Sequence, residues 1–278
     1  MMRDLIGHPE LCAINTATLG FQKPLVETVE AIARAGFGGI APWRRELEGQ
    51  NVNAISKHIR DAGLKVTGYC RSTYIPAGTR SEFENSIQDN YRALDDAATL
   101  GAESLMIVTG TLPADLVLAR AQVAEGVHML CDYAKPLGLK ISLEPLHPVY
   151  ALDRSCINTM AQALDLCETI DADNLGICID AYHVWWDPNL NRDIARAGLK
   201  NRIFGFHVND WLVPTTNILN DRGMMGDGIV DLKNLRGLVE GAGYNGLIEV
   251  EIFSTENWWK KPIAETLQVI KQRMASSV

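Results

Sequence analysis

The chain has 278 residues, of which 47% are hydrophobic, and it carries a formal net charge of -8 at pH 7. This length and composition are typical of a soluble globular protein with a large core. The acidic balance argues against general electrostatic attraction to nucleic acid or to an anionic membrane surface, and no apolar run is long enough for a membrane span. The six cysteines include no CxxC pair and the N-terminal residues resemble no secretory signal, so we expect reduced thiols and a cytoplasmic protein.

Strand-like and helix-like segments alternate along the whole chain. The run LCAIN at 11–15 precedes an amphipathic segment over 24–36, in which Leu25, Val29 and Ile32 recur at helical spacing and Gly36 ends the helix. Seven similar pairs follow. Their strands are expected at 38–43, 65–70, 103–108, 140–144, 175–180, 203–208 and 246–251, and their helices at about 51–62, 82–100, 114–135, 157–170, 189–199, 231–242 and 262–274.

Eight such units predict an α/β fold, a single (β/α)8 TIM barrel over residues 1–278, because right-handed crossovers cover each parallel strand with a helix. An open doubly wound sheet is the alternative, but no GxGxxG turn follows the first strand. The longest stretch without a predicted element, 209–230, contains Pro214 and three glycines. We interpret it as a lid or a pocket wall.

The last four predicted strands each close on a residue that can bind a metal ion. Strands of a barrel end together at one mouth, so these four distant side chains are expected to converge. One imidazole and three carboxylates suit Mn²⁺, Mg²⁺ or Co²⁺ better than a structural zinc site. The sequence therefore predicts one divalent ion, preferably Mn²⁺, held by Glu144, Asp180, His207 and Glu251.

The motifs around these residues, SLEPLHP, IDAYH, FHVND and EVEIFS, resemble the xylose-isomerase-like TIM barrels. This family includes sugar epimerases of the tagatose 3-epimerase type, inositol-catabolism isomerases and zinc AP endonucleases. The resemblance runs over most of the chain and implies the same four metal ligands. Glu249 is an alternative to Glu251, which is nearer the C-terminal mouth. The resemblance also implies substrate contacts for His183, in a DxxH pattern, and for Arg222, in DRGMMGDG.

The sequence departs from the endonuclease branch of this family. The extra histidines of that branch are replaced by YCRSTY and VTGTLP, and its DRH triplet by Asp221-Arg222-Gly223. We therefore do not expect a trinuclear zinc nuclease. The second predicted strand ends on Trp43 and Arg44 where the family usually has an acidic residue, and we expect Trp43 to line a substrate pocket, with simple packing as the alternative.

The resemblance implies chemistry on a keto-sugar through an enediolate intermediate. Glu144 and Glu251 would act as base and acid, which gives epimerisation or isomerisation. His147, three residues after Glu144, is a further candidate acid or base. With it, the same intermediate could expel a β substituent, as in the metal-bearing subunit of C-glycoside deglycosidases, which resembles this barrel and acts with a small partner subunit. A non-catalytic sugar-binding barrel is the third alternative.

Tryptophans gather near the predicted mouth. Trp185 and Trp211 are expected to stack on a sugar, although aromatic residues of this kind also mark subunit interfaces, and we expect a homo-oligomer. No Gly-rich phosphate loop is present, which favours an unphosphorylated small-molecule sugar as substrate.

Overall fold

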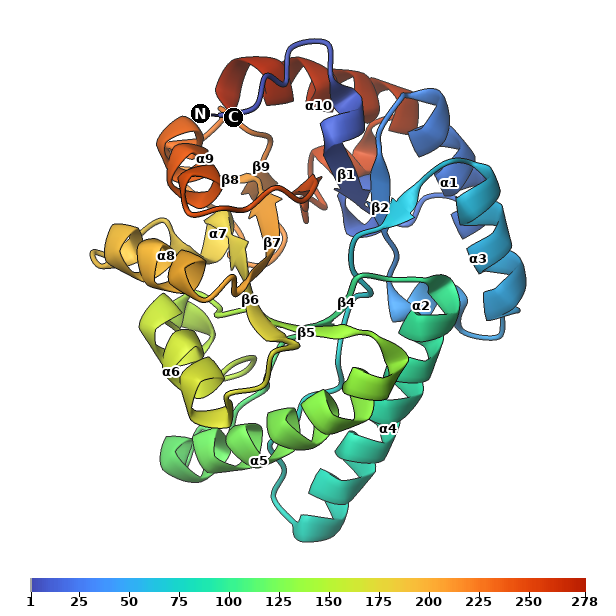
Figure 1. Ribbon diagram of the computed structural model, residues 1–278. Coiled ribbons are helices and arrows are strands. Elements are labelled where there is room, and N and C mark those ends of the chain that lie inside the picture. The colour runs from blue at the N-terminus through green and yellow to red at the C-terminus, as the bar shows by residue number, and fades with distance from the viewer. Residues whose placement is uncertain (1) are drawn as a thin grey trace.

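Eight parallel strands form the wall of a barrel in the computed structural model, which describes residues 2–278 (Figure 1). Their hydrogen-bonded order is β3-β2-β1-β10-β7-β6-β5-β4. The two ends of this order meet through the bridges Val66–Ala102 and Tyr69–Leu105, and Tyr69 N donates to Ser104 O at 2.9 Å. The predicted (β/α)8 fold is therefore confirmed. The strands are β1 (Cys12–Asn15), β2 (Gly39–Ala41), β3 (Lys65–Val66), β4 (Ser104–Ile107), β5 (Lys140–Leu143), β6 (Leu175–Asp180), β7 (Ile203–Val208) and β10 (Ile248–Val250).

Eight helices surround the barrel, and each predicted helix is confirmed with its ends shifted by three residues or fewer. The earlier start of the third has a local cause, because Thr79 and Glu82 form a reciprocal capping box there. Gly101 ends that helix in the left-handed conformation, as its position in the sequence indicates. The helices are α1 (Leu25–Arg34), α3 (Val52–Asp61), α4 (Arg80–Leu100), α5 (Leu116–Ala134), α6 (Met160–Ile170), α8 (Leu190–Leu199), α9 (Leu232–Gly241) and α10 (Ile263–Ser277).

Several short elements were not expected from the sequence. The 209–230 stretch begins with β8 (Asp210–Trp211), which pairs antiparallel with β9 (Arg222–Gly223), so this loop is tied down as a ribbon beside the barrel mouth. Short α-helices and 3-10 helices follow several strands or connect longer elements. They are α2 (Arg44–Leu47), α7 (Ala181–Val184), η1 (Pro9–Leu11), η2 (Thr16–Leu19), η3 (Lys135–Leu137), η4 (Pro148–Tyr150) and η5 (Trp258–Lys260).

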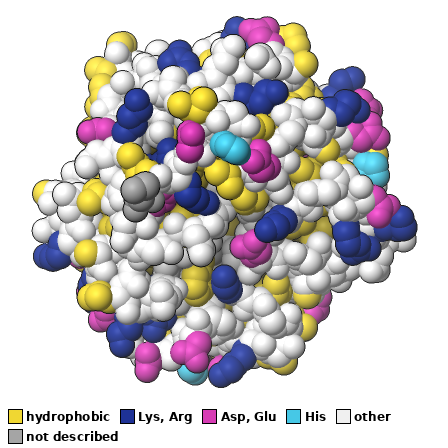
Figure 2. Space-filling view, turned by 45° about the horizontal axis from the view of Figure 1, so that its top comes forward, with side chains coloured by type: hydrophobic (Ala, Val, Ile, Leu, Met, Phe, Trp, Pro, Cys, Tyr) yellow, Lys and Arg dark blue, Asp and Glu magenta, His cyan; other side chains and the backbone are white. Residues whose placement is uncertain are grey.

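The structure also shows how the surface charges are distributed and where the cysteines lie. Figure 2 shows basic and acidic side chains interspersed over the visible face. All six cysteines are buried and none is bonded to another. Within residues 2–278, no helix has both the length and the apolar character needed to cross a membrane.

Candidate metal centre and substrate cavity

Strand alternation explains why polar side chains point into the barrel. On β6, Ile177 and Ile179 belong to the core between strands and helices, whereas Cys178 lies in a separate small cluster inside the barrel. Asp180 has the same parity as Cys178, so it faces inward one step nearer the mouth. The same rule applies to β5, β7 and β10, whose outward residues are Ile141, Leu143, Phe206, Val208, Ile248 and Val250.

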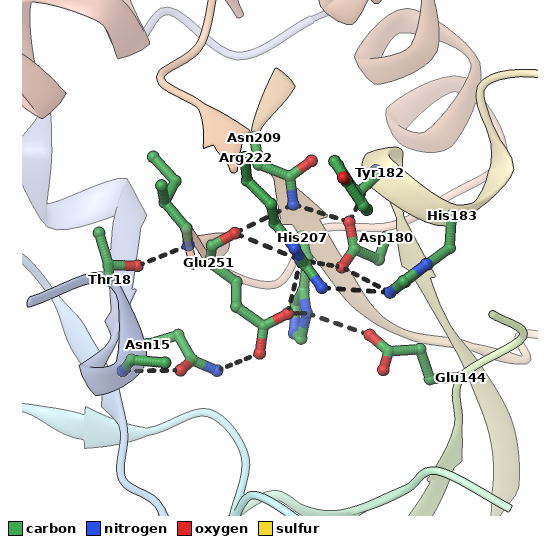
Figure 3. A network of polar contacts seen from close by, with 12 residues as sticks. Asn15, Thr18, Glu144, Asp180, Tyr182, His183, His207, Asn209, Arg222 and Glu251 are labelled. Carbon is green, nitrogen blue, oxygen red and sulfur yellow. Dashed lines mark hydrogen bonds and ion pairs between the residues drawn. The ribbon is translucent and has the colours of Figure 1, made fainter. Parts of the chain in front are cut away.

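The four predicted metal ligands converge at the mouth of the barrel (Figure 3). Each can offer one ligand atom such that all four atoms lie within 4.8 Å of one another. His207 Nδ1 is 3.5 Å from Glu144 Oε1 and 3.6 Å from Glu251 Oε2. These separations are those of ligands that share an ion at about 2.0–2.3 Å.

Two of the four ligand atoms are buried without a hydrogen-bond partner among residues 2–278, which tests whether the residues fit a metal. Glu144 Oε1 and His207 Nδ1 are buried and make no hydrogen bond to any residue in the 2–278 range. Buried polar atoms ordinarily have a partner, because leaving one unsatisfied costs about 1–3 kcal/mol. A divalent ion at the convergence point would satisfy both atoms, so the donor set fits such a group. Within these residues, the only clusters that could hold a metal share Glu144 and His207, which indicates one centre rather than several.

Glu249 lies behind His207 rather than beside the other ligands. Glu249 Oε1 is 3.2 Å from His207 Nε2, the ring nitrogen turned away from the convergence point. Asn15 Nδ2 and Thr67 Oγ1 donate to the two Glu249 oxygens at 2.9 and 2.6 Å, which fixes this carboxylate. The arrangement favours the Nε2–H tautomer and leaves Nδ1 available as a ligand. It also favours Glu251 over Glu249 as the fourth ligand.

Arg222 is a buried cation beside the carboxylates. Its NH1 group donates to Asp180 Oδ2 at 2.8 Å and to Glu251 Oε2 at 3.1 Å, while its NH2 group lies 3.2 Å from His183 Nε2. The guanidinium is also sandwiched between the rings of Tyr182 and Phe253. Arg222 and His183 both line the cavity that also contains Glu144 and Glu251.

Burial and charge shift the pKa values of these groups in different directions. Burial raises the pKa of Glu144 to about 7. Burial would also raise the pKa of Asp180, but the Arg222 charge outweighs it and lowers that pKa to about 2. Burial lowers the pKa of His183 to about 3, so this imidazole is neutral. The pKa of His207 shifts in the direction opposite to that of His183. Burial would lower it, but Cys178 and Glu249 hold that pKa well above its usual value.

A cavity of about 230 Å³ lies above the centre and includes Glu144 and Glu251 in its lining. Trp43 lines it, and Trp43 Nε1 donates to Asn15 Oδ1 at 2.7 Å. Leu219 and Asn220 also line it, so the 209–230 stretch serves as a pocket wall. The remaining aromatic wall was not predicted as a set. It consists of Phe21, Tyr74, Tyr150, Phe253 and Trp259.

Three residues predicted for this site do not line the cavity. His147 stacks on Trp211 with ring centroids 4.9 Å apart, and Trp211 is also stacked on Tyr182 and packs against Trp185. His147 N donates to His183 Nδ1 at 3.2 Å, so this aromatic cluster contacts the cavity lining through His183. The expectation that His147, Trp185 and Trp211 contact substrate stays a prediction, and in this structure His147 and Trp185 both pack on Trp211.

Asn15 and Asn209 are site residues that the sequence reading missed. Asn15 Nδ2 donates to Glu251 Oε1 at 2.9 Å as well as to Glu249, and Asn209 Nδ2 donates to Asp180 Oδ1 at 2.8 Å. Both residues orient carboxylates of the centre. A signal was present, since Asn15 closes the first strand and Asn209 follows the seventh.

Several known proteins are similar to this chain. The family model described as "Xylose isomerase-like TIM barrel" matches residues 29–273. An inosose isomerase from Bacillus licheniformis is 29% identical over 55% of this chain and 54% of its own length. A 3-dehydroshikimate dehydratase from Pseudomonas aeruginosa is 27% identical over 86% of this chain but only 38% of its own length. A 2-oxo-tetronate isomerase from Haemophilus influenzae is 26% identical over 86% of this chain and 92% of its own length.

Solved structures share the same architecture. The crystal structure of protein SMc04130 from Sinorhizobium meliloti is 45% identical and superposes with a TM-score of 0.94, covering 97% of this chain and 99% of that one. A structure of the IOLI protein with a bound zinc atom is 22% identical, with a TM-score of 0.83 over 96% of this chain and 97% of that one. The second likeness, at this identity, shows the fold alone.

Proposed function

Because the chain belongs to the xylose isomerase-like TIM barrel family, we propose that it is a divalent-metal-dependent isomerase or epimerase of keto-sugars. The observation that carries this proposal is the buried quartet, in which Glu144 and Glu251 approach His207 from either side at the floor of the cavity (Figure 3). Relatives named as isomerases of an inosose and of a 2-oxo-tetronate support the same class of reaction.

The proposed metal ligands are the four converging residues, Glu144, Asp180, His207 and Glu251. Their mixture of oxygens and one nitrogen favours Mn²⁺, with Mg²⁺ and Co²⁺ as alternatives. The zinc atom in the IOLI structure supports a divalent ion in a barrel of this fold and makes Zn²⁺ a further candidate. When bound, the ion would stabilise negative charge that develops on a substrate oxygen.

The chain's own residues would move the proton. Glu144 and Glu251 are the two carboxylates that line the cavity, so one would remove the proton from carbon and the other would return it. Neutral His183 lines the same cavity, where its Nε2 atom lies beside the Arg222 guanidinium. Return of the proton to the same carbon gives epimerisation, whereas return to the neighbouring carbon gives isomerisation.

A lyase is the second candidate, supported by the relative named 3-dehydroshikimate dehydratase. Elimination begins with the same proton removal but needs a group that protonates the leaving oxygen. His147 was the sequence-based candidate, but it stacks on Trp211 and does not line the cavity that contains Glu144 and Glu251. In this alternative one of the two glutamates would have to protonate the leaving oxygen in addition to its role in the isomerase. The isomerase therefore remains our preferred proposal.

The test is solvent deuterium exchange at substrate carbon, followed by NMR with metal-loaded protein over a panel of keto-sugars and 3-keto-glycosides. We expect C–H exchange with an isomer or epimer as product, and a loss of about 100-fold or more in Glu251→Gln when metal content is matched. Glu256→Gln, an exposed change on the same segment, is the control. Cleavage of a 3-keto-glycoside would favour the lyase, and sugar binding without any exchange would leave a non-catalytic barrel.

A further inference from the structure

Three arginines outside the proposed metal centre line the same cavity as Glu144 and Glu251. Arg45 comes from α2, Arg71 follows the third strand, and Arg154 follows η4. They therefore reach the cavity from three separate loops of the barrel mouth. The chain as a whole carries a formal net charge of -8, so this concentration of positive charge runs against the overall balance.

These arginines differ from Arg222 in their partners. Arg222 is neutralised by Asp180 and Glu251. Within residues 2–278, by contrast, no carboxylate lies within 4.0 Å of the guanidinium of Arg45 or Arg71, and Arg154 has only the exposed Asp153 at 3.4 Å. The acidic residues in the cavity lining are Glu144 and Glu251, which are already assigned to the metal centre.

Aromatic rings hold two of these guanidinium groups by their faces. The Arg71 guanidinium lies 4.5 Å from the centroid of the Tyr74 ring, and that of Arg45 lies 4.5 Å from the centroid of the Phe21 ring. Stacking uses the face of a guanidinium and leaves the N–H groups in its plane available, which is the edge that binds oxyanions in a forked geometry. Arg71 uses one such group on Ser72 O at 3.1 Å, which also fixes its orientation.

Arg71 also lines a neighbouring cavity of about 790 Å³ between α2, α3 and α4. Arg44 lies in that second cavity too, but it is paired with Asp89 at 2.9 Å. The pairing is strong enough to lower the pKa of Asp89 well below its usual value. At the junction of the two cavities, Arg71 is therefore the half-buried cation that lacks a carboxylate partner.

We propose that the substrate carries an oxyanion, a carboxylate or a phosphate, which Arg71 binds with help from Arg45 and Arg154. The carbon that exchanges its proton would then lie deeper in the cavity, between Glu144 and Glu251. The substrate class is a keto-sugar acid or a keto-sugar phosphate rather than a neutral sugar. This assignment rests on the proposed function for its choice of reacting carbon, whereas the oxyanion site itself follows from the arginines alone.

Isothermal titration of metal-loaded protein with matched probes tests the oxyanion site directly. D-gluconate is compared with D-glucitol, and D-fructose 6-phosphate with D-fructose, so that each pair differs mainly in charge. We expect the charged member of at least one pair to bind about 10-fold or more tightly at low salt, with a smaller advantage at high salt. The pair that shows the larger advantage identifies carboxylate or phosphate as the natural group.

Substitutions locate the site. Arg71→Gln should remove most of the charged probe's advantage and lower the affinity for the neutral probe far less, and Arg45→Gln and Arg154→Gln should each remove a part of that advantage. Arg60→Gln, an exposed change outside the cavity lining, alters the net charge equally and should have no effect. Affinity for the neutral probe reports that each variant is folded. If Arg71→Gln kept the full advantage, the anion would be bound elsewhere, for instance on the metal itself, and the proposal would be overturned.

The outcome separates this inference from the proposed function. Proton exchange on neutral keto-sugars without any preference for charged probes would reject the oxyanion site and keep the isomerase. A charge preference that depends on Arg71, without proton exchange on any probe, would keep the oxyanion site and reject the isomerase.

Discussion

Glu249 provides a sharp test of the proposed metal centre, because it contacts His207 but is not itself one of the four converging ligands. Its Oε1 atom lies 3.2 Å from His207 Nε2, and its two oxygens accept hydrogen bonds from Asn15 and Thr67. Glu249→Gln can keep its oxygen toward Asn15 and His207, because the Thr67 hydroxyl can rotate to accept from the new amide. Glu249→Leu keeps none of these interactions.

The expected losses are therefore graded. A partner of this kind that orients a metal-binding histidine typically contributes 10- to 100-fold in metal affinity. We expect about 10-fold weaker metal binding for Glu249→Gln and about 100-fold for Glu249→Leu, which correspond to about 1.4 and 2.7 kcal/mol. Glu249→Gln measures the effect on metal affinity of losing the negative charge alone. Glu249→Leu measures the effect of losing the hydrogen-bond acceptor as well.

Competition with a chromophoric chelator measures these affinities for Mn²⁺ and Zn²⁺, and thermal unfolding with and without metal shows whether each variant folds. Glu256→Gln and Glu256→Leu are the matched controls, because that side chain is 77% exposed and lies outside the cavity lining. Wild-type affinity in Glu249→Leu would refute the assignment of His207 as a ligand oriented by this carboxylate.

Three further predictions follow from the surroundings of the centre. Metal affinity should rise between pH 6 and 8, because the pKa of Glu144 is raised to about 7 and that of His207 is also raised, so that protons compete with the ion. Calorimetry in buffers of different ionisation enthalpy should detect about one to two protons released on binding. Arg222→Met should lower the free energy of unfolding of the metal-free protein by about 3–5 kcal/mol, since it leaves Asp180 and Glu251 buried without their cation. A smaller loss in denaturant titrations would show that these carboxylates are already protonated. His147→Ala should lower the free energy of unfolding by about 1 kcal/mol through the lost stacking on Trp211, yet leave metal content and proton exchange nearly unchanged. Loss of exchange in a folded, metal-loaded variant would instead support His147 as an acid or base.

The sequence predicted the fold well because two local periodicities repeat eight times. Helical spacing located all eight surrounding helices, and the alternation of inward and outward residues on a strand follows from its period of two. Thus Asp180 and Cys178 share one face of β6, while Ile177 and Ile179 share the other. The convergence of Glu144, Asp180, His207 and Glu251 required only this alternation and the closure of the barrel.

The parts that were predicted poorly lie after the strands rather than on them. Beyond a strand end, the direction of a side chain depends on how its loop packs, which no local period encodes. Trp211 illustrates this point. Because β8 pairs with β9, the indole stacks on Tyr182 and does not line the cavity. Phe21, Arg71 and Phe253 line the cavity from loops of three different units, so only the folded structure brings them together.

The charges of the barrel mouth are unequally divided between its floor and its rim. At the floor, the carboxylates of Glu144, Asp180, Glu249 and Glu251 are nearly inaccessible to solvent, and Arg222 is the fixed cation that contacts two of them. Buried carboxylates without sufficient positive charge take up protons, which is the physical meaning of the raised pKa of Glu144. A divalent ion bound by the four converging residues would supply the missing charge at the floor. At the rim the imbalance has the opposite sign, because Arg45 and Arg71 lack carboxylate partners within the described residues. A ligand that places electron-rich oxygens at the floor and a full negative charge at the rim complements both regions at once, and a neutral sugar complements only the first.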